Sequence, residues 1–439
     1  MTVTVARPTW QPRLTQLVNQ ITDQGDLRSP PWRDALLAIP RHLFIPHYYL
    51  QDTSHRPTRW IRHEPDDTES TRRWLDLVYS PTTLITEMAQ YADRGVQTPV
   101  CSSTKPDLMI RMLEALDVHD GHRVLEIGTG TGYNAALLCH RLGEHTVCSV
   151  DIDPTLIAAA RQRLARLDYH PTLVTRDGAE GLPEHAPFDR IIATCSLRAF
   201  PTGWIHQLRP GGTALVHLEG PLGAGNLLAL RRDTTQPRVQ GRFLPWWGCF
   251  MARRTSAGPT TGSPRPARTT EAATTRDTTV NPAEVDGTQM FPFLAQLHLP
   301  PGIYRAIYLT DAGVPVTYLA CPDGSWCEIN RQPDSTGRHT VREAGPTRLW
   351  AAIETAWTQW TQLGAPAWHE FGLTATPAEH RIWHRDPHSG PQWTLPPDPL
   401  TTRTELPGVT ADAGGVPRRH HPRRSEPGDP RASFKSRER

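Results

Sequence analysis

A glycine loop carries the clearest chemical signal in the chain, in the sequence VLEIGTGTGY at 124–133. An apolar strand is expected before the loop and a helix after it. Glycine lets a backbone turn sharply and approach a ligand closely. The candidate ligand-binding residues of this loop are Glu126, Gly128, Thr129, Gly130 and Gly132.

The spacing of these glycines separates two classes of nucleotide cofactor. A dinucleotide-binding loop reads G-x-G-x-x-G, and its last glycine packs a helix on a strand. Here the spacing is G-x-G-x-G, and Tyr133 stands where that last glycine would be. Because this pattern requires no pyrophosphate site, S-adenosylmethionine (SAM) fits the loop better than NAD.

An acidic residue follows at the end of the next expected strand. Asp151 lies 19 residues after Gly132, and a carboxylate about 20 residues after such a loop can accept hydrogen bonds from ribose hydroxyls. Asp153 is a nearby competitor, but it precedes Pro154 and suits the cap of a helix. We therefore expect Asp151 to be the ribose ligand.

A third acidic residue, Asp177, follows the next expected strand, with Gly178 beside it. Its carboxylate can accept a hydrogen bond from an adenine amino group. The alternative is a plain Asp-Gly turn, and the register with the preceding motifs favours the ligand. Asp189 lies behind Phe188 at the start of a later strand, where we expect a structural role.

A cluster of hydroxyl side chains lies upstream, where Ser102, Ser103 and Thr104 precede a helix expected to begin at Pro106. A hydroxyl just before a helix usually caps the first turn. The alternative is that these side chains line the site and orient a substrate. Residue spacing leaves both interpretations open.

Apolar strands alternate with helical segments through residues 101–253. We expect strands at 122–127, 146–150, 172–175, 189–194 and 212–217, and helices at 106–117, 133–142, 154–167 and 201–208. Such alternation predicts a parallel, doubly wound α/β sheet. Ligands bind such sheets at the carboxyl ends of the strands, near the point where strand order reverses.

The other residues are expected to form four segments around the core at 101–253. Residues 1–100 form a helical lead-in, and 254–290, rich in Thr, Ala, Pro and Gly, form a disordered linker. Residues 291–396 form a smaller α+β domain that holds seven of the fourteen tryptophans. Residues 397–439 form a disordered, basic tail.

Within 291–396, two strands are expected at 305–309 and 314–319 and an amphipathic helix at 348–357. The tryptophans can form an ordinary core, which we favour. The alternative is an aromatic surface that binds a peptide.

Composition argues against several functional classes. The 439 residues have a formal net charge of +2, so no footprint for nucleic acid is expected. The sequence contains no run of 18 apolar residues, so no membrane span is expected. The seven cysteines include no C-x-x-C pair, the histidines lack metal-ligand spacing, and the N-terminus lacks an apolar signal core. These features predict a cytoplasmic protein without a metal site.

Five motifs between residues 40 and 250 resemble those of protein-L-isoaspartate O-methyltransferases. They are PRHLFIP at 40–46, the glycine loop at 124–133, DGAEG at 177–181, PFD at 187–189 and LRPGG at 208–212. The resemblance implies a class I SAM-dependent methyltransferase fold, with a Rossmann-like sheet. It also implies methylation of the free carboxylate of an Asp or isoaspartate residue, giving an ester that collapses to a succinimide.

The same resemblance assigns roles to individual residues. Those that would hold SAM are Glu126, Gly128, Gly130 and Asp151, with Asp177 and Gly178 at its adenine. The family's active-site serine falls in a serine-x-proline stretch, with which Thr104-Lys105-Pro106 aligns, so Thr104 replaces that serine. Because a carboxylate is already anionic at neutral pH, Ser102, Ser103 and Thr104 would orient the substrate rather than act as nucleophiles.

The C-terminal half resembles an extension found in an actinobacterial subgroup of the family. The likeness rests on DGSW at 323–326, GPTRLW at 345–350 and WHEFGLT at 368–374. Members of that subgroup accompany ribosomal peptide maturation systems of the ATP-grasp and lanthipeptide types. They methylate an Asp of a macrocyclised precursor peptide and drive it to aspartimide. The implied partner is a peptide or protein bearing Asp or isoaspartate.

Three functions are compatible with these features. The leading one is tailoring of a ribosomally made, modified peptide. The second is general isoaspartyl repair, although the extension argues against an enzyme that must accept many unrelated sites. The third is a non-catalytic SAM-binding protein that escorts a peptide. Small-molecule methylation accounts for neither the motif at 40–46 nor the hydroxyl cluster.

Overall fold

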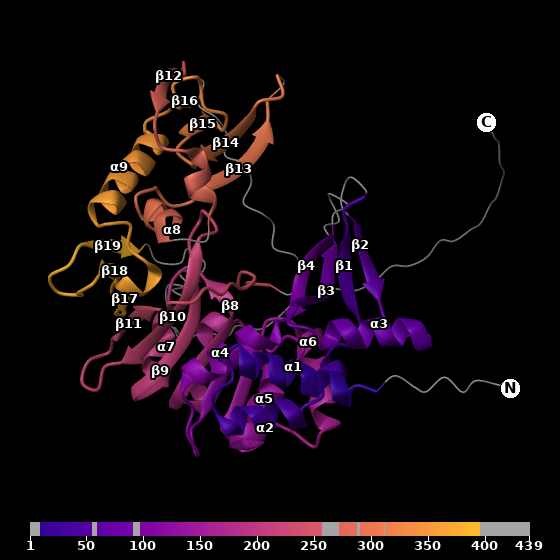
Figure 1. Ribbon diagram of the computed structural model, residues 1–439. Coiled ribbons are helices and arrows are strands. Elements are labelled where there is room, and N and C mark those ends of the chain that lie inside the picture. Colours follow the sequence, from indigo (N-terminus) through magenta and orange to yellow (C-terminus); the bar gives the residue numbers. More distant parts are fainter. Residues whose placement is uncertain are drawn as a thin grey trace, which may run out of the picture. The chain divides into compact units, whose positions relative to one another are not determined.

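The computed structural model describes residues 9–54, 59–90, 97–256, 272–287, 290–310 and 312–395. Five parallel strands form one half of its largest, ten-stranded sheet (Figure 1). They are β5 (Val124–Ile127), β6 (Val147–Asp151), β7 (Thr172–Thr175), β8 (Phe188–Leu197) and β9 (Leu208–Glu219). Their order is β7-β6-β5-β8-β9, so strand order reverses between β5 and β8. The predicted doubly wound core is confirmed, with β8 and β9 longer than expected.

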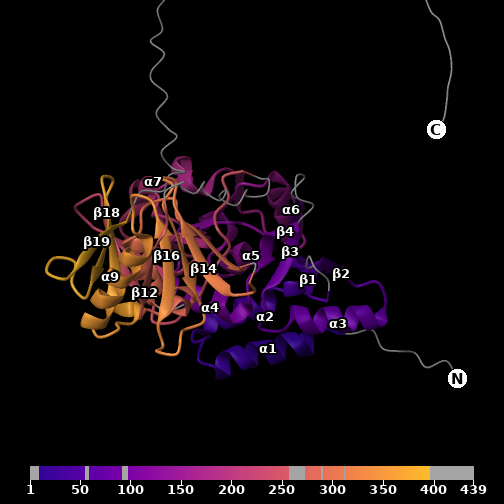
Figure 2. The same cartoon turned by 90° about the horizontal axis from the view of Figure 1, so that it is seen from above.

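Helices cover both faces of these strands (Figures 1 and 2). One face packs against α1 (Gln11–Asp23), α2 (Pro30–Ala38), α4 (Pro106–Leu116), α5 (Tyr133–Leu142) and α6 (Pro154–Ala165). The other packs against α7 (Thr202–Gln207) and α8 (Met290–Leu297). Short 3₁₀ helices fill the connections as η2 (Glu144–Thr146), η3 (Gly178–Glu180) and η4 (Pro183–His185). Proline at the first positions of α4 and α6 fixes where these helices begin.

Antiparallel strands extend the sheet beyond β9. They are β10 (Gly225–Arg232), β11 (Val239–Phe243), β17 (Phe371–Ala375), β18 (His380–His384) and β19 (Gln392–Leu395). β11 pairs with β17 from Val239↔Ala375 to Arg242↔Gly372. The expected extent of the domain at 291–396 is therefore wrong in part, because its last three strands belong to the core sheet. They cover an edge of β11 that would otherwise be unpaired.

The rest of the C-terminal half forms a five-stranded antiparallel sheet. Its elements are β12 (Thr274–Thr278), β13 (Tyr304–Leu309), β14 (Pro315–Ala320), β15 (Trp326–Asn330), β16 (His339–Ala344), α9 (Leu349–Gln362), η5 (Pro282–Asp286) and η6 (Trp368–Glu370). The two predicted strands and the predicted helix are confirmed. Five of the seven tryptophans are buried, namely Trp326, Trp350, Trp368, Trp383 and Trp393. The core interpretation of these tryptophans is confirmed.

The predicted linker is wrong in its extent, because β12 lies inside 254–290 and pairs with β16. β12 has the sequence TTRDT. Because it lacks large apolar residues, hydrophobic patterning does not predict it as a strand. Polar contacts hold it instead: Arg276 forms ion pairs with Glu343 and Glu354 at 2.9 and 2.8 Å. The linker residues 257–271 and the predicted tail at 397–439 lie outside the described residues.

The helical lead-in predicted over 1–100 also needs correction, because it includes a four-stranded antiparallel sheet in the order β2-β1-β3-β4. The elements here are η1 (Arg41–Phe44), β1 (Tyr48–Asp52), β2 (Arg59–His63), α3 (Thr68–Val78), β3 (Leu84–Gln90) and β4 (Gln97–Ser103). These strands gain their stability from cross-strand pairing, which single-strand propensity reflects poorly. None of the helices described is long and apolar enough to cross a membrane.

Candidate active site

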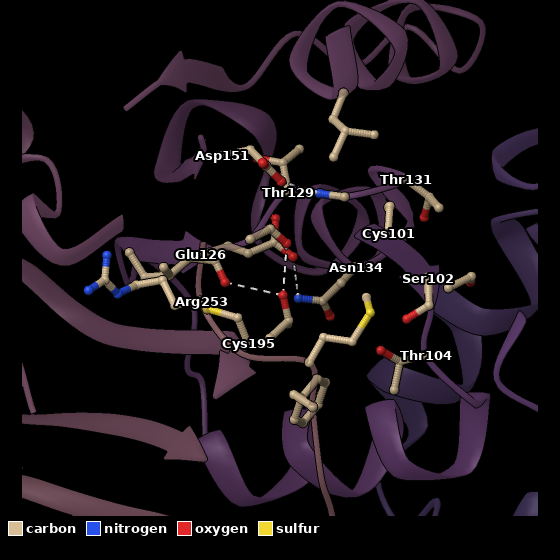
Figure 3. Close-up of a pocket in the computed structure, with 18 of the residues that line it drawn as sticks. Cys101, Ser102, Thr104, Glu126, Thr129, Thr131, Asn134, Asp151, Cys195 and Arg253 are labelled. Atoms are coloured by element: carbon tan, nitrogen blue, oxygen red, sulfur yellow. Dashed lines mark hydrogen bonds between the residues drawn. The ribbon is translucent and has the colours of Figure 1, made fainter. Parts of the chain in front are cut away.

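A cavity of about 510 Å³ opens where the carboxyl ends of β5, β6 and β8 meet, at the reversal of strand order (Figure 3). The predicted site residues that line it are Ser102, Ser103, Thr104, Glu126, Gly128, Thr129, Gly130, Asp151 and Gly178. Gly132 and Asp177 are not among the lining residues. Figure 3 shows Ser102 and Thr104 on one side and Asp151 and Arg253 on the other.

The glycine loop approaches the cavity through its backbone. Gly130 has a φ of +51°, and a Cβ placed on it would lie 3.4 Å from Sγ of Cys101. A side chain at this position would therefore fill space that a ligand needs. Gly132 has a φ of +87°, and its Cβ would lie 3.0 Å from that of Ala160 in α6. Gly132 thus packs the loop on a helix, which explains why it does not reach the cavity.

Glu126 lies at the buried floor of the site and is fully enclosed. Its carboxylate accepts hydrogen bonds from Nδ2 of Asn134 at 2.7 Å and from Oγ of Ser149 at 2.5 Å. Burial raises the pKa of Glu126 to about 7, because the charged form loses its hydration. The carboxylate is held rigidly by side chains of α5 and β6.

Asn134 offers a polar atom for which no partner is found within the described chain. Its Oδ1 is buried and accepts no hydrogen bond, while its Nδ2 is engaged by Glu126. A buried carbonyl oxygen without a donor is costly, and this side chain lines the cavity. The amino group of SAM is a donor of the required kind. The residues present therefore fit SAM.

Asp151 reaches the cavity from the end of β6. Its Oδ2 accepts from the backbone N–H of Gly130 at 2.9 Å, and its Oδ1 accepts from that of Asp153 at 3.1 Å. Burial raises the pKa of Asp151. Each carboxylate oxygen retains a further lone pair, so the group can still accept from a ribose. Asp153 instead caps α6 through the N–H of Thr155 at 2.9 Å, as predicted.

Asp177 does not line the cavity, contrary to the expectation that it binds adenine. Its Oδ1 accepts from Nη1 of Arg253 at 2.5 Å and from the N–H of Ala179 at 2.9 Å, so it serves both an ion pair and a turn. Arg253 lines the cavity in its place, together with Arg254, which lies 3.7 Å from Asp153. Only the neighbouring Gly178 reaches the cavity wall.

The hydroxyl cluster is not a helix cap. Ser102 and Ser103 belong to β4, and the cap position of α4 is Lys105, which makes no side-chain cap. The capping interpretation is therefore wrong for this cluster. The hydroxyl of Ser103 is buried and faces Nη2 of Arg41 at 3.4 Å. Ser102 and Thr104 present their side chains to the cavity (Figure 3).

Sequence inspection missed several residues that line the cavity, namely Cys101, Asn134, Thr194, Cys195, Phe250, Met251, Arg253 and Arg254. The last four belong to a segment after β11 that returns along the end of β8: the N–H of Ser196 donates to Met251 at 2.8 Å, and that of Arg253 donates to Ser196 at 2.9 Å. Asn134 alone carried a usable signal, because it follows the glycine loop on the first turn of α5.

Asp189 lies away from the cavity, at the start of β8. It accepts from the N–H of Arg123 at 2.9 Å and forms an ion pair with Arg209 at 3.2 Å. This contact set is structural, as expected. Across the described residues, no cluster of three or more His, Cys, Asp or Glu side chains could hold a metal ion.

Comparison with known proteins gives consistent results. Residues 79–237 match the model of the family described as protein-L-isoaspartate(D-aspartate) O-methyltransferase. The protein-L-isoaspartate O-methyltransferase of Xanthobacter autotrophicus is 37% identical over 181 residues, which are 39% of this chain and 82% of that protein. That of Rhodospirillum rubrum is 37% identical over 152 residues, covering 33% and 67%.

Two solved structures cover more of the chain, at lower sequence identity. One described as a protein-L-isoaspartate O-methyltransferase covers 84% of this chain and 98% of its own, with 22% identity and a TM-score of 0.47. A Plasmodium falciparum protein described as a putative protein-L-isoaspartate O-methyltransferase, crystallised with S-adenosyl-L-homocysteine, covers 55% of this chain and 98% of its own. Its identity is 14% and its TM-score 0.40.

Proposed function

The chain belongs to the protein-L-isoaspartate O-methyltransferase family, and from that premise we propose that it methylates the carboxylate of an isoaspartyl residue in a peptide or protein. One observation carries the proposal: the glycine loop and the hydroxyls of Ser102 and Thr104 line the same cavity. A cofactor on the loop and a carboxylate on the hydroxyls would then face each other.

The proposed chemistry needs orientation rather than a base. When bound, SAM supplies a methyl group on a positively charged sulfur. An isoaspartyl carboxylate has an ordinary pKa near 4 and is anionic at neutral pH. Ser102 and Thr104 would donate to one carboxylate oxygen and leave the other free to attack. The enclosing walls would exclude water and hold the reacting atoms in line.

The ester then reacts within the substrate. The following backbone amide nitrogen bonds to the ester carbonyl carbon, the carbon–methoxy bond breaks, and methanol leaves with the amide proton. The product is a succinimide. In this proposal the chain's own residues act only in the transfer step.

A pair of peptides tests the proposal. An L-isoaspartyl peptide and its aspartyl twin are each incubated with the protein and SAM, and products are followed by mass spectrometry. We expect methyl gain and then methanol loss on the isoaspartyl peptide alone. SAM binding in the same sample is the control. SAM binding without transfer to either peptide would contradict the repair-type activity and point to a dedicated, pre-modified peptide substrate.

Thr104 gives a sharper test, because it stands where the family has its active-site serine. Replacing Thr104 with Val removes the hydroxyl at similar size, so turnover should fall while SAM affinity is unchanged. Thr104→Ser is the matched control and should retain activity. Unchanged turnover in Thr104→Val would move the substrate site to Ser102 or Ser103.

A second candidate is a dedicated tailoring enzyme that converts an Asp of a macrocyclised precursor peptide to aspartimide. It is favoured by the C-terminal half, whose strands β17–β19 continue the core sheet beside β11. Methylation of a cyclised aspartyl peptide, with no methylation of linear isoaspartyl peptides, would support it. We also propose a cytoplasmic location, since all seven cysteines are free thiols.

A further inference from the structure

Arg41 is a buried cation with no carboxylate within ion-pair distance in the described part of the chain, although the charge of Asp107 is close enough to favour its protonated form. Its side chain is fully enclosed. The guanidinium donates instead to backbone carbonyl oxygens, at 2.6 Å to Val78, 3.1 Å to Thr82 and 3.1 Å to Thr104. Longer contacts reach the carbonyls of Ser80 at 3.3 Å and Ser103 at 3.4 Å. Burial lowers the pKa of Arg41 to about 10, which leaves it charged at neutral pH.

Retaining such a charge is expensive, because an enclosed cation loses its hydration and here gains only neutral acceptors. The carbonyls come from three separate segments, which are the end of α3, the turn before β3 and the end of β4. Arg41 therefore joins these segments at one point.

The end of β4 is the part of this arrangement that reaches the cavity. Because a trans peptide is planar, the carbonyl of Ser103 that faces Arg41 sets the N–H of Thr104 on the opposite side. Within the described chain, no acceptor is found for that N–H. Thr104 also lines the cavity. Its amide and hydroxyl are thus both available for an anionic oxygen.

The other cations near the cavity have other partners. Arg163 donates to the carbonyl of Thr131 at 3.2 Å. Arg253 and Arg254 lie beside Asp177 and Asp153, at the end expected to hold the nucleoside. Lys105 forms an ion pair with Asp107 at 2.8 Å. Arg41 lies directly behind residues 102–104, and water screens its charge weakly because its side chain is fully buried.

We propose that Arg41 is a positioning residue for the substrate-carboxylate subsite. From behind β4 it orients the Ser103–Thr104 peptide toward the cavity, and its charge favours a carboxylate over a neutral group of the same shape. This inference rests on the proposed function, in which the substrate group is an isoaspartyl carboxylate.

The test measures preference for charge. An isoaspartyl peptide and its isoasparaginyl twin, which differ in a carboxylate against an amide, are titrated into the protein saturated with S-adenosylhomocysteine. We expect the wild-type protein to bind the carboxylate about tenfold more tightly, as charge-assisted hydrogen bonds allow. A wild-type ratio below about twofold would overturn the inference by itself.

Variants then locate the source of that preference. In Arg41→Met the ratio of the affinities for the isoaspartyl and isoasparaginyl peptides should fall to about twofold or less. The KM for peptide should rise, and the affinity for S-adenosylhomocysteine should not change. Arg41→Lys keeps the charge and should retain most of the preference, whereas Arg41→Gln keeps donors and should not. The Lys and Gln variants decide the matter if Arg41→Met does not fold.

Arg190 supplies the matched control, because it also donates to carbonyl oxygens, at 2.6 Å to Leu116 and 2.6 Å to Asp117, away from the cavity. Arg190→Met should change stability but not the ratio. An equal loss of affinity for both peptides in Arg41→Met would show a merely structural role and overturn the inference. Absence of methyl transfer and of peptide binding in the wild-type protein would instead refute the proposed function.

Discussion

Two acidic residues that reach the cavity, Glu126 and Asp151, are held by different kinds of partner. Side chains of Asn134 and Ser149 hold Glu126, whereas backbone N–H groups of Gly130 and Asp153 hold Asp151. The carboxylate of Asp151 is thereby tied to the shape of the glycine loop. Loss of either carboxylate should therefore have a distinct consequence.

Asp151→Ala should weaken SAM binding, because it removes the proposed ribose acceptor and an anchor of the loop at once. Calorimetric titration with S-adenosylhomocysteine measures this effect. Asp153→Ala is the control: it should cost about 1 kcal/mol of stability through loss of the α6 cap while leaving affinity nearly unchanged. Equal affinities for wild type and Asp151→Ala would remove the ribose assignment.

Glu126 should give the unliganded protein a specific pH dependence. Its pKa is about 7 in the folded state against an ordinary value of 4.5. Between these values the folded protein binds the proton and the unfolded chain releases it. The contribution of this group to stability therefore falls as pH rises through that window and is lowest above it.

Thermal denaturation of wild type and Glu126→Gln at the two ends of the window checks this. The melting temperature of the variant, relative to that of the wild type, should be higher above pH 7 than below pH 4.5. The difference between the two proteins cancels the titration of all other groups. A difference that does not change with pH would contradict the expected protonation of Glu126.

Among elements, the contact between α8 and the turn joining β9 to β10 ties the C-terminal half to the methyltransferase core. Gln296 of α8 is buried, accepts from the N–H of Leu222 at 3.1 Å and donates to the carbonyl of Ala224 at 3.1 Å. Gly220 makes room for it, since a Cβ there would lie 2.0 Å from Cδ of Gln296. One amide side chain thus satisfies the polar groups of a buried turn.

Gln296→Ala should lower stability by roughly 1–3 kcal/mol, because the N–H of Leu222 would stay buried without an acceptor. Chemical or thermal denaturation measures the loss. Gln51→Ala, at an exposed position of β1, is the control and should have little effect. If the two variants melt alike, the turn does not depend on α8.

For the chain as a whole, the sheet and the hydrophobic core both continue from the methyltransferase core into the C-terminal half. Phe243 at the end of β11 is buried, with its ring 5.2 Å from that of Phe293 and 5.0 Å from that of Trp368. The pairing of β11 with β17 continues the hydrogen bonding across the same junction. These contacts predict that both halves unfold together.

Phe243→Ala should lower a single unfolding transition by about 3–5 kcal/mol, the usual cost of removing a buried phenylalanine ring. Differential scanning calorimetry tests both the number of transitions and their shift. Leu50→Ala, at an exposed leucine, serves as control. Two separate transitions, with only one affected by Phe243→Ala, would refute cooperative unfolding.

The glycine loop, the parallel strands and part of the cavity lining could be predicted from sequence because each depends on local chemistry. Gly130 permits a positive φ, Pro154 starts a helix, and alternating apolar segments indicate a doubly wound sheet. These signals can be recognised in the sequence without knowledge of the fold. They placed Ser102, Ser103 and Thr104 near the site but could not separate lining from capping.

Tertiary structure alone decided the partners that arrive from distant residues. Arg253 takes Asp177 out of the cavity wall, and Arg41 reaches the end of β4 from more than sixty residues away. The polar strand β12 and the joining of β17 to β11 likewise depend on pairing across the fold. Such contacts carry no local pattern, because their energy comes from burial and hydrogen bonds that exist only once the chain has folded.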